Sequence, residues 1–201
     1  VFSKRSNTVK LSKTSRQNTG DGRDILTGIE NVNGGGGNDK IYGNKGANTL
    51  RGDSGKDKLY GKSGKDKLYG GSGKDKLYGE SGNDKLYGGT GHDALNGGTG
   101  NDILDGGTGN DSLIGGKGKD TAVFSKRSNT VKLSKTSRQN TGDGRDVLRG
   151  VENVNGGGGN DKIYGNKAAN TLKGDSGDDK LYGGSGKDKL YGGTGNDTLD
   201  G

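Results

Sequence analysis

Residues 52–87 read GDSGKDKLY GKSGKDKLY GGSGKDKLY GESGNDKLY, which is one nine-residue unit written four times in succession. Gly stands at positions one and four of each unit, Asp at six, Leu at eight and Tyr at nine. In the same frame the unit extends over residues 34–123 and returns over residues 156–200. A short period repeated with this fidelity predicts a solenoid in which each unit packs only against its neighbours.

Each unit divides into a turn and a short strand. Glycines at positions one, two and four suit a turn with positive φ, where a Cβ would clash. The last three residues place one apolar side chain between two polar ones, as in a strand with one buried face. Nine residues cannot bury a leucine alone, so we expect two units to form one coil and unit n to stack on unit n+2, about 4.8 Å away. The expected core is the column of position-eight side chains: Ile41, Leu50, Leu59, Leu68, Leu77, Leu86, Leu95, Leu104 and Leu113.

The same stacking brings the position-six aspartates into columns. Carboxylates at strand spacing repel by about 1 kcal/mol in water and about 4 kcal/mol at an effective dielectric near 20, so the columns need a cation between their members. Calcium, with about 6–8 oxygen ligands, suits such turns better than magnesium, which demands a strict octahedron. The lack of Cys and the single His argue against zinc. The predicted metal ligands are Asp39, Asp57, Asp66, Asp75, Asp84, Asp93, Asp102, Asp111, Asp120, Asp161, Asp179, Asp188 and Asp197.

The units GGGGNDKIY (34–42), GGTGNDILD (97–105) and GGTGNDTLD (192–200) resemble the nonapeptide of RTX, or haemolysin-type, calcium-binding repeats. The resemblance implies an all-β fold, a right-handed parallel β-roll, with calcium held between units n and n+2 by the aspartates and by carbonyls of positions one to four. It also implies a protein secreted by a type I system and disordered until it meets millimolar calcium outside the cell. The predicted function is therefore calcium-triggered folding of a secreted or cell-surface protein, or a stalk within one.

The composition excludes a conventional hydrophobic core. Gly accounts for 47 of 201 residues, apolar residues for 22%, and the mean hydropathy is −1.04. Such a chain is expected to be disordered unless metal ligation replaces part of the missing burial. No apolar run is long enough for a membrane helix, and the sequence holds no nucleophile–base set and no phosphate-binding loop motif. We therefore expect neither a membrane span nor an enzyme.

The net charge of +7 departs from the family that the chain resembles, whose members are usually acidic. Lysines beside the tyrosines of position nine would give a recognition or adhesin module that binds acidic polysaccharide, lipopolysaccharide or nucleic acid, although no specific nucleic-acid partner is expected. The simpler interpretation is that lysines keep the roll soluble and soften repulsion between aspartates, while tyrosines stack along each face. Thr90, Thr99 and Thr108 at position three make ice binding a weaker alternative.

A long repeat contains the short one, because residues 1–24 recur identically at 123–146. We call residues 1–33 the first spacer and residues 124–155 the second spacer. The sequence predicts four segments: a basic spacer and roll cap at 1–33, a first β-roll of ten units at 34–123, a repeated basic spacer and cap at 124–155, and a second β-roll of five units at 156–201.

The first spacer is expected to cap the roll. Val9 and Leu11 alternate with polar residues, which predicts a short half-buried strand. Ile29 and Val32 are expected to cover the open end of the leucine column, since terminal repeats are commonly atypical.

Some units depart from the pattern in ways that bear on calcium binding. Asn48 and Asn170 replace the position-six Asp, and Ala168 replaces a position-four Gly, so we expect weakened sites in both units. Lys62 and Glu80 stand at position two, where a positive φ would strain a residue with a Cβ. Complete aspartate pairs predict about nine bound calcium ions.

Overall fold

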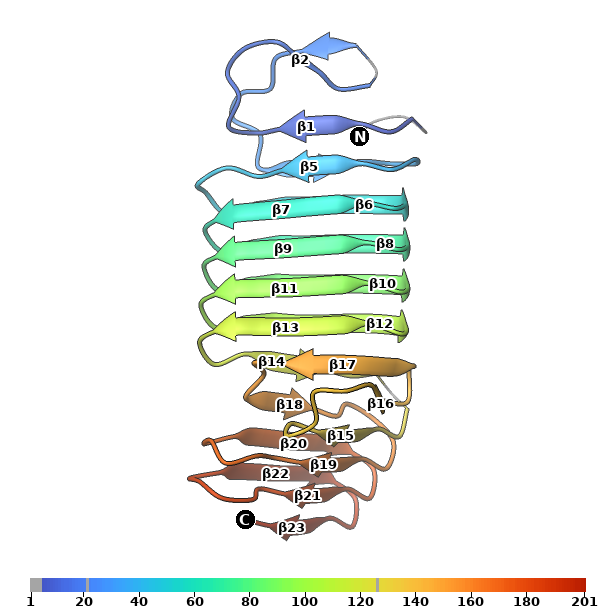
Figure 1. Ribbon diagram of the computed structural model, residues 1–201, viewed down its shortest axis with the longest axis vertical. Coiled ribbons are helices and arrows are strands. Elements are labelled where there is room, and N and C mark those ends of the chain that lie inside the picture. The colour runs from blue at the N-terminus through green and yellow to red at the C-terminus, as the bar shows by residue number, and fades with distance from the viewer. Residues whose placement is uncertain (1–4, 21, 126) are drawn as a thin grey trace.

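The computed structural model of the chain describes residues 5–20, 22–125 and 127–201. Over these residues the chain is all-β, and its strands stack as parallel coils into one long solenoid (Figure 1). The predicted fold class, a parallel β-roll, is therefore confirmed. Within the described ranges there is no helix long and apolar enough to cross a membrane.

Successive strands alternate between sheets, so neighbours within a sheet come from different coils. One sheet consists of β1 (Thr8–Lys10), β5 (Lys40–Tyr42), β7 (Lys58–Ser63), β9 (Lys76–Ser81), β11 (Ala94–Thr99), β13 (Ser112–Lys117), β17 (Arg145–Arg149) and β16 (Gln139–Asn140). The longest consists of β22 (Lys189–Thr194), β20 (Thr171–Ser176), β18 (Asn153–Asn155), β14 (Thr121–Val123), β12 (Ile103–Gly109), β10 (Lys85–Gly91), β8 (Lys67–Gly73), β6 (Thr49–Gly55) and β4 (Asn31–Asn33). The two short sheets are β15 (Thr130–Lys132), β19 (Lys162–Tyr164), β21 (Lys180–Tyr182) and β23 (Thr198–Asp200), and the hairpin β2 (Gln17–Asn18) and β3 (Arg23–Asp24).

The strand register confirms that unit n lies on unit n+2. Leu59 pairs with Leu77 in the eight-stranded sheet, and Leu68 pairs with Leu86 in the nine-stranded sheet. Strand pairing is parallel apart from the hairpins β2–β3 and β16–β17. The predicted leucine and isoleucine column is completely buried and forms a single core that runs the length of the roll.

The second spacer lies between the two runs of repeats and joins their sheets. Strand β14 ends the first run, β18 belongs to the spacer, and β18 pairs with both β14 and β20. Strand β17 extends the first run by pairing with β13, whereas β15 begins the four-stranded sheet of the second run. The four predicted segments remain a prediction, and the sheets cross the boundaries between them.

The first spacer caps the roll only in part. Strand β1 forms as predicted, with Val9 and Leu11 buried. Val32 is buried and pairs with Leu50, but Ile29 is 38% exposed, so the expectation for Ile29 was wrong. The inward position of β4 belongs to Val32, and Ile29 lies ahead of that strand, directly after a turn at Gly28 (φ 62°).

The turns use glycine for two different reasons. Positions two and four have positive φ, as at Gly89 (107°) and Gly91 (136°), and Lys62 (84°) and Glu80 (73°) adopt the same strained conformation. Position one does not have a positive φ, so that part of the prediction was wrong. Its glycine is required because a Cβ would strike oxygens of its own unit and of the next coil.

Candidate calcium sites

The predicted aspartates lie in columns along the roll, at the end of each turn. In each column the backbone N–H of one aspartate donates to Oδ1 of the aspartate in the next coil, as Asp57 does to Asp75 and Asp66 to Asp84 at 2.8 Å. The first column of the first roll comprises Asp39, Asp57, Asp75, Asp93 and Asp111, and the second comprises Asp66, Asp84, Asp102 and Asp120. In the second roll, Asp161, Asp179 and Asp197 form one column, and Asp188 lies next to Asn170 in the other.

The second carboxylate oxygen of most column aspartates is buried and lacks a hydrogen-bond partner among the described residues. These Oδ2 atoms belong to Asp57, Asp66, Asp75, Asp84, Asp93, Asp102, Asp111, Asp120, Asp161, Asp179 and Asp188. A buried polar atom without a partner is unfavourable, and a carboxylate oxygen more so. A ligand that satisfies these oxygens would therefore stabilise the roll.

Each such oxygen points to the glycine that begins its own unit, and in all of these units except those of Asp111, Asp161 and Asp188 a carbonyl oxygen of the next coil lies close to the same glycine. A Cβ on Gly88 would lie 2.6 Å from Asp93 Oδ2 and 2.5 Å from the carbonyl oxygen of Gly106. A Cβ on Gly70 would likewise lie 2.5 Å from Asp75 Oδ2 and 2.6 Å from the carbonyl oxygen of Gly88. Carboxylate and carbonyl oxygens from two coils thus converge beside a residue with no side chain.

Burial raises the pKa of the column carboxyls. The pKa of Asp57 and of Asp111 rises to about 7, and that of Asp75 to about 6, because burial disfavours the charged form. The hydrogen bond from a backbone N–H opposes this rise in each case, and neighbouring carboxylates add to it. The columns therefore hold carboxylates whose negative charge is poorly stabilised by the protein alone.

This oxygen-only arrangement fits calcium. Within the described residues no three His, Cys, Asp or Glu side chains gather at one point, so carboxylates would supply only part of a coordination shell. The rest would come from carbonyls of the glycine-rich turns, a combination that calcium accepts. The assignment of the individual aspartates as ligands remains a prediction.

The two units without an aspartate close their turns by other means. Asn48 Oδ1 accepts the N–H of Asn44 at 2.8 Å, and Asn44 Oδ1 accepts the N–H of Gly46 at 2.8 Å. In the equivalent unit of the second roll, Asn170 Oδ1 accepts the N–H of Asn166 in the same way. In these turns side-chain amide oxygens accept the backbone N–H groups, and no carboxylate stands at position six. Weakened calcium sites are therefore still expected in these two units.

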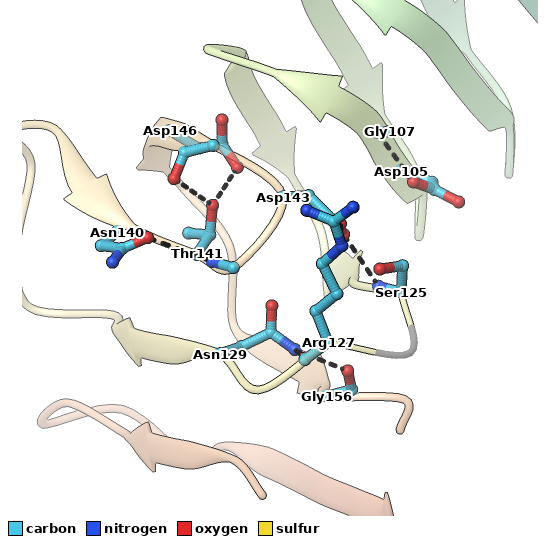
Figure 2. A network of polar contacts seen from close by, with 12 residues as sticks. Asp105, Gly107, Ser125, Arg127, Asn129, Asn140, Thr141, Asp143, Asp146 and Gly156 are labelled. Carbon is cyan, nitrogen blue, oxygen red and sulfur yellow. Dashed lines mark hydrogen bonds and ion pairs between the residues drawn. The ribbon is translucent and has the colours of Figure 1, made fainter. Parts of the chain in front are cut away.

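Two columns of the first roll continue into the second spacer, through Asp146 and Glu152. Asp146 continues the first column, since its Oδ1 accepts the N–H of Asp111 at 2.7 Å, but its Oδ2 accepts a hydrogen bond from the hydroxyl of Thr141 (Figure 2). Glu152 continues the second column, and its Oε2 accepts the N–H of Asp120 at 2.9 Å. Residues 141–149 carry Gly at positions two and four, Asp at six and Leu at eight of a nine-residue unit, which is a signal for Asp146, whereas Glu152 stands in no such unit.

At the start of the column formed by Asp161, Asp179 and Asp197, a side-chain amide donates to the oxygens of the turn. Asn129 Nδ2 donates to the carbonyl of Gly156 at 3.0 Å and to Asp161 Oδ1 at 2.9 Å, and Figure 2 shows the first of these bonds. Asn7 makes the equivalent bonds to Gly34 and Asp39. A donor amide thus takes up the carbonyl oxygen of Gly156 and Oδ1 of Asp161, while Asp161 Oδ2 keeps no partner among the described residues.

The tyrosines stack as expected along the faces of the roll. Ring centroids of Tyr42 and Tyr60 are 4.7 Å apart, and those of Tyr69 and Tyr87 are 4.9 Å apart. Lys62 lies over the ring of Tyr42 at 5.9 Å. Among the described residues the lysines next to Asp57 in sequence form no ion pair with it, so any relief of carboxylate repulsion by these lysines acts at longer range.

Comparison with known protein families agrees with this geometry. A family model for the RTX calcium-binding nonapeptide repeat (4 copies) matches residues 26–59, 51–86, 60–95, 87–122, 140–167, 149–181 and 164–199. No curated protein matches the chain. The family matches cover most of the chain, including both runs of nonapeptides and parts of both spacers. The chain therefore belongs to the RTX calcium-binding nonapeptide repeat family.

Proposed function

We propose that this calcium-binding repeat module is part of a secreted or cell-surface protein and folds when it meets calcium outside the cell. The observation that carries the proposal is the set of buried Oδ2 atoms without partners, such as those of Asp75 and Asp84. Stacking ionised carboxylates in a buried column is unfavourable without a cation, so calcium-poor surroundings disfavour the folded roll.

Calcium, when bound, supplies positive charge between two coils and takes up oxygens that the protein leaves without donors. The protein's own part is to hold those oxygens in place. The backbone N–H of each aspartate fixes Oδ1 of the next, and the position-one glycine leaves the space beside Oδ2 open. Each filled site would stabilise the fold by about 2.7 kcal/mol when calcium is at a hundred times its dissociation constant.

A calorimetric titration combined with far-UV circular dichroism tests this proposal. We expect about nine calcium ions per chain and a β signal that develops with calcium but not with an equal concentration of magnesium. A full β signal in chelator would refute calcium-triggered folding. Binding of about two ions or fewer would refute the column sites themselves.

A recognition role remains the second candidate, because lysines line the tyrosine stacks. Lys10 and Lys40 both lie within 5.5 Å of the Tyr42 ring centroid, where they interact with the protein's own aromatic face. We expect no binding to heparin, a model acidic polysaccharide, at physiological salt in the calcium-loaded state. Binding that weakens steeply with salt would favour the recognition role instead. We expect no catalytic activity from either role.

A further inference from the structure

Three asparagines of this chain are followed directly by glycine: Asn33, Asn96 and Asn155. In each case the glycine is the one that begins a nonapeptide unit. A side chain does not fit at that glycine, because a Cβ on Gly97 would lie 2.3 Å from Asp102 Oδ2 and 2.7 Å from the carbonyl oxygen of Gly115. The geometry of the candidate calcium sites therefore creates an Asn–Gly pair wherever asparagine precedes a unit.

An Asn–Gly pair can lose its side-chain amide without an enzyme, because glycine has no Cβ to hinder ring closure. The glycine nitrogen gives its proton to a base in the solvent and bonds to Cγ of the asparagine. The Cγ–Nδ2 bond breaks, and the nitrogen takes up a proton and leaves as ammonia. Water then opens the succinimide ring at either carbonyl. Opening at Cγ leaves aspartate, and opening at the main-chain carbonyl leaves isoaspartate, whose backbone runs through Cβ and Cγ.

The folded roll opposes this reaction at Asn96. Asn96 lies inside β11, where it pairs with Tyr78 of β9 on one side and with Ile114 of β13 on the other (Figure 1). Extended strand backbone directs the next nitrogen away from the side chain, so ring closure requires ψ of the asparagine to leave the strand region. Because both neighbouring strands hold this backbone, Gly97 N reaches Cγ of Asn96 only when the sheet opens.

Hydrogen bonds oppose the reaction at the other two pairs. The N–H of Gly156, which has to lose its proton, donates to the carbonyl of Lys173 at 2.9 Å. The side chain of Asn155 is held as well, because its Oδ1 accepts the N–H of Gly157 at 3.0 Å. The pair at residues 33–34 makes the equivalent bonds at 2.8 Å and 2.9 Å. The fold therefore engages both the reacting nitrogen and the reacting side chain.

The two products differ in their effect on the roll. Aspartate fits before a unit, since Asp105 stands there and its Oδ1 accepts the N–H of Gly107 at 3.0 Å. Isoaspartate at residue 96 instead adds a carbon to the backbone of β11. The residues that follow it then lose their register with β9 and β13, and a parallel sheet with one buried face does not tolerate such a slip.

We propose that the three Asn–Gly pairs are sites of spontaneous deamidation that calcium controls through folding, an inference that rests on the proposed function because the calcium-free chain must be unfolded. Without calcium, the backbone at each pair samples the conformations that close the ring. With calcium, the strands exclude them. A chain that stays long without calcium accumulates isoaspartate and loses the register that the roll needs, so its ability to fold is limited in time.

Peptide mapping of the full chain, aged at mildly alkaline pH in chelator, in calcium or in magnesium, tests the proposal. Trypsin places the three pairs on separate peptides: residues 24–40, 86–117 and 150–162. The mass shows exchange of amide for acid, and labelling with an isoaspartyl methyltransferase shows isoaspartate. We expect deamidation to be at least about tenfold faster in chelator or magnesium than in calcium. Asn101, on the same peptide as Asn96 but followed by aspartate, should keep its amide in all three solutions.

Circular dichroism after calcium is added back measures the consequence for folding. Aged wild-type chain should recover less β signal than fresh chain, in proportion to its isoaspartate. The triple variant Asn33→Gln, Asn96→Gln, Asn155→Gln should recover fully, because glutamine keeps the amide but closes a larger ring more slowly. Fresh Asn96→Asp should fold like the wild type, which separates the effect of isoaspartate from that of added charge. The mapping itself needs only the wild-type chain.

Equal deamidation rates in calcium and chelator, with a β signal that depends on calcium, would overturn the inference and leave the proposed function intact. Aged chain that carries isoaspartate at residue 96 and still recovers the full β signal would overturn the limit on folding. A full β signal in chelator would refute the proposed function, and equally slow deamidation in both solutions would then exclude control by calcium.

Discussion

Each column aspartate depends on the glycine that begins its unit. Gly88 is not in the positive-φ region, yet its missing side chain leaves the space toward which Asp93 Oδ2 and the Gly106 carbonyl point. Where Thr141 stands at position one, its hydroxyl occupies that space and satisfies Asp146. The residue at position one therefore decides whether the position-six carboxylate has a partner. A hydroxyl at position one donates to Oδ2 of that carboxylate, whereas a glycine leaves Oδ2 without a donor.

Removing a carboxylate in the middle of a column should lower the number of bound calcium ions more than removing one at a column end. Asp75 has aspartates on both sides, Asp57 and Asp93, whereas Asp161 has Asp179 on one side and the Asn129 amide on the other. Asp75→Asn should lose about two calcium ions per chain and Asp161→Asn about one, measured by calorimetry. Asp53→Asn, an exposed aspartate outside the columns, is the control. Equal losses from the two column variants would contradict pairing between successive coils.

Two stacked position-four glycines should respond oppositely to alanine. Gly46 does not have a positive φ, and its Cβ would meet only Asn44 Oδ1 at 3.3 Å. Gly64 lies on it with φ 119°, and its Cβ would lie 2.8 Å from the backbone of Gly46. Gly46→Ala should be neutral or raise stability by about 0.4–1 kcal/mol, as Ala168 at the equivalent position suggests. Gly64→Ala should destabilise by more than about 1 kcal/mol, and similar thermal midpoints for the two variants would count against this account.

At the scale of elements, a unit is a turn that carries charge and a strand that carries the core. Strand pairing holds the turns at strand spacing, so the carboxylates have no freedom to separate. The strands therefore gain hydrogen bonds and burial at the same geometry in which the turns accumulate repulsion. Protons and calcium are two ways to remove that repulsion.

Acid should stabilise the calcium-free roll and weaken calcium binding. The pKa of Asp57, Asp75 and Asp111 is raised in the fold from the ordinary value of 3.8 to about 6 or 7. Their contribution to stability is thus fully present below about pH 4 and is lost as the pH rises through about 6 to 7. Calcium needs the ionised form, so its affinity should fall over the same range.

Circular dichroism of the chain in chelator, followed from neutral to acidic pH, measures the first effect, and calcium titrations at each pH measure the second. The calcium-free β signal should increase on acidification, with most of the change between about pH 7 and 5. Stability of the calcium-free chain that rises with pH would disprove the assignment of raised pKa values to the columns.

At the scale of the whole molecule, stability is the sum of the contacts between neighbouring coils along the axis of the solenoid. Each coil contacts only the coils on either side, so the central coils have two neighbours and the end coils one. The leucines of the central units are fully buried, whereas Leu199 is 48% exposed. The molecule should therefore open from its ends.

Hydrogen exchange in saturating calcium should follow that gradient. Amides of β8, β10 and β12 should exchange slowest, and those of β2, β3 and β23 fastest, because end coils open with less loss of packing. The amides of β17 serve as an internal control, since they occupy the sequence position of β3 but pair with β13. Equal protection of β3 and β17 would contradict the pairing of β3 with β2 alone.

The repeat by itself determined the parallel roll, the leucine core, the aspartate columns and the tyrosine stacks. It could do so because each unit contacts only near copies of itself, so a period fixes the partner, the register and the facing side chains together. The positive φ at Lys62 and Glu80 followed from the same logic, since their turns stack on turns built with glycine.

Only the tertiary structure decided what happens where the period breaks. Strand β17 pairs with β13 although β15 comes earlier in the chain, and Glu152 enters a column from outside the nine-residue frame. A strand of a few residues carries no local signal for its partner, because its backbone groups fit any open parallel edge. The edge that is open, and hence the exposure of Ile29 and the burial of Val151, depends on which coils already lie beside it.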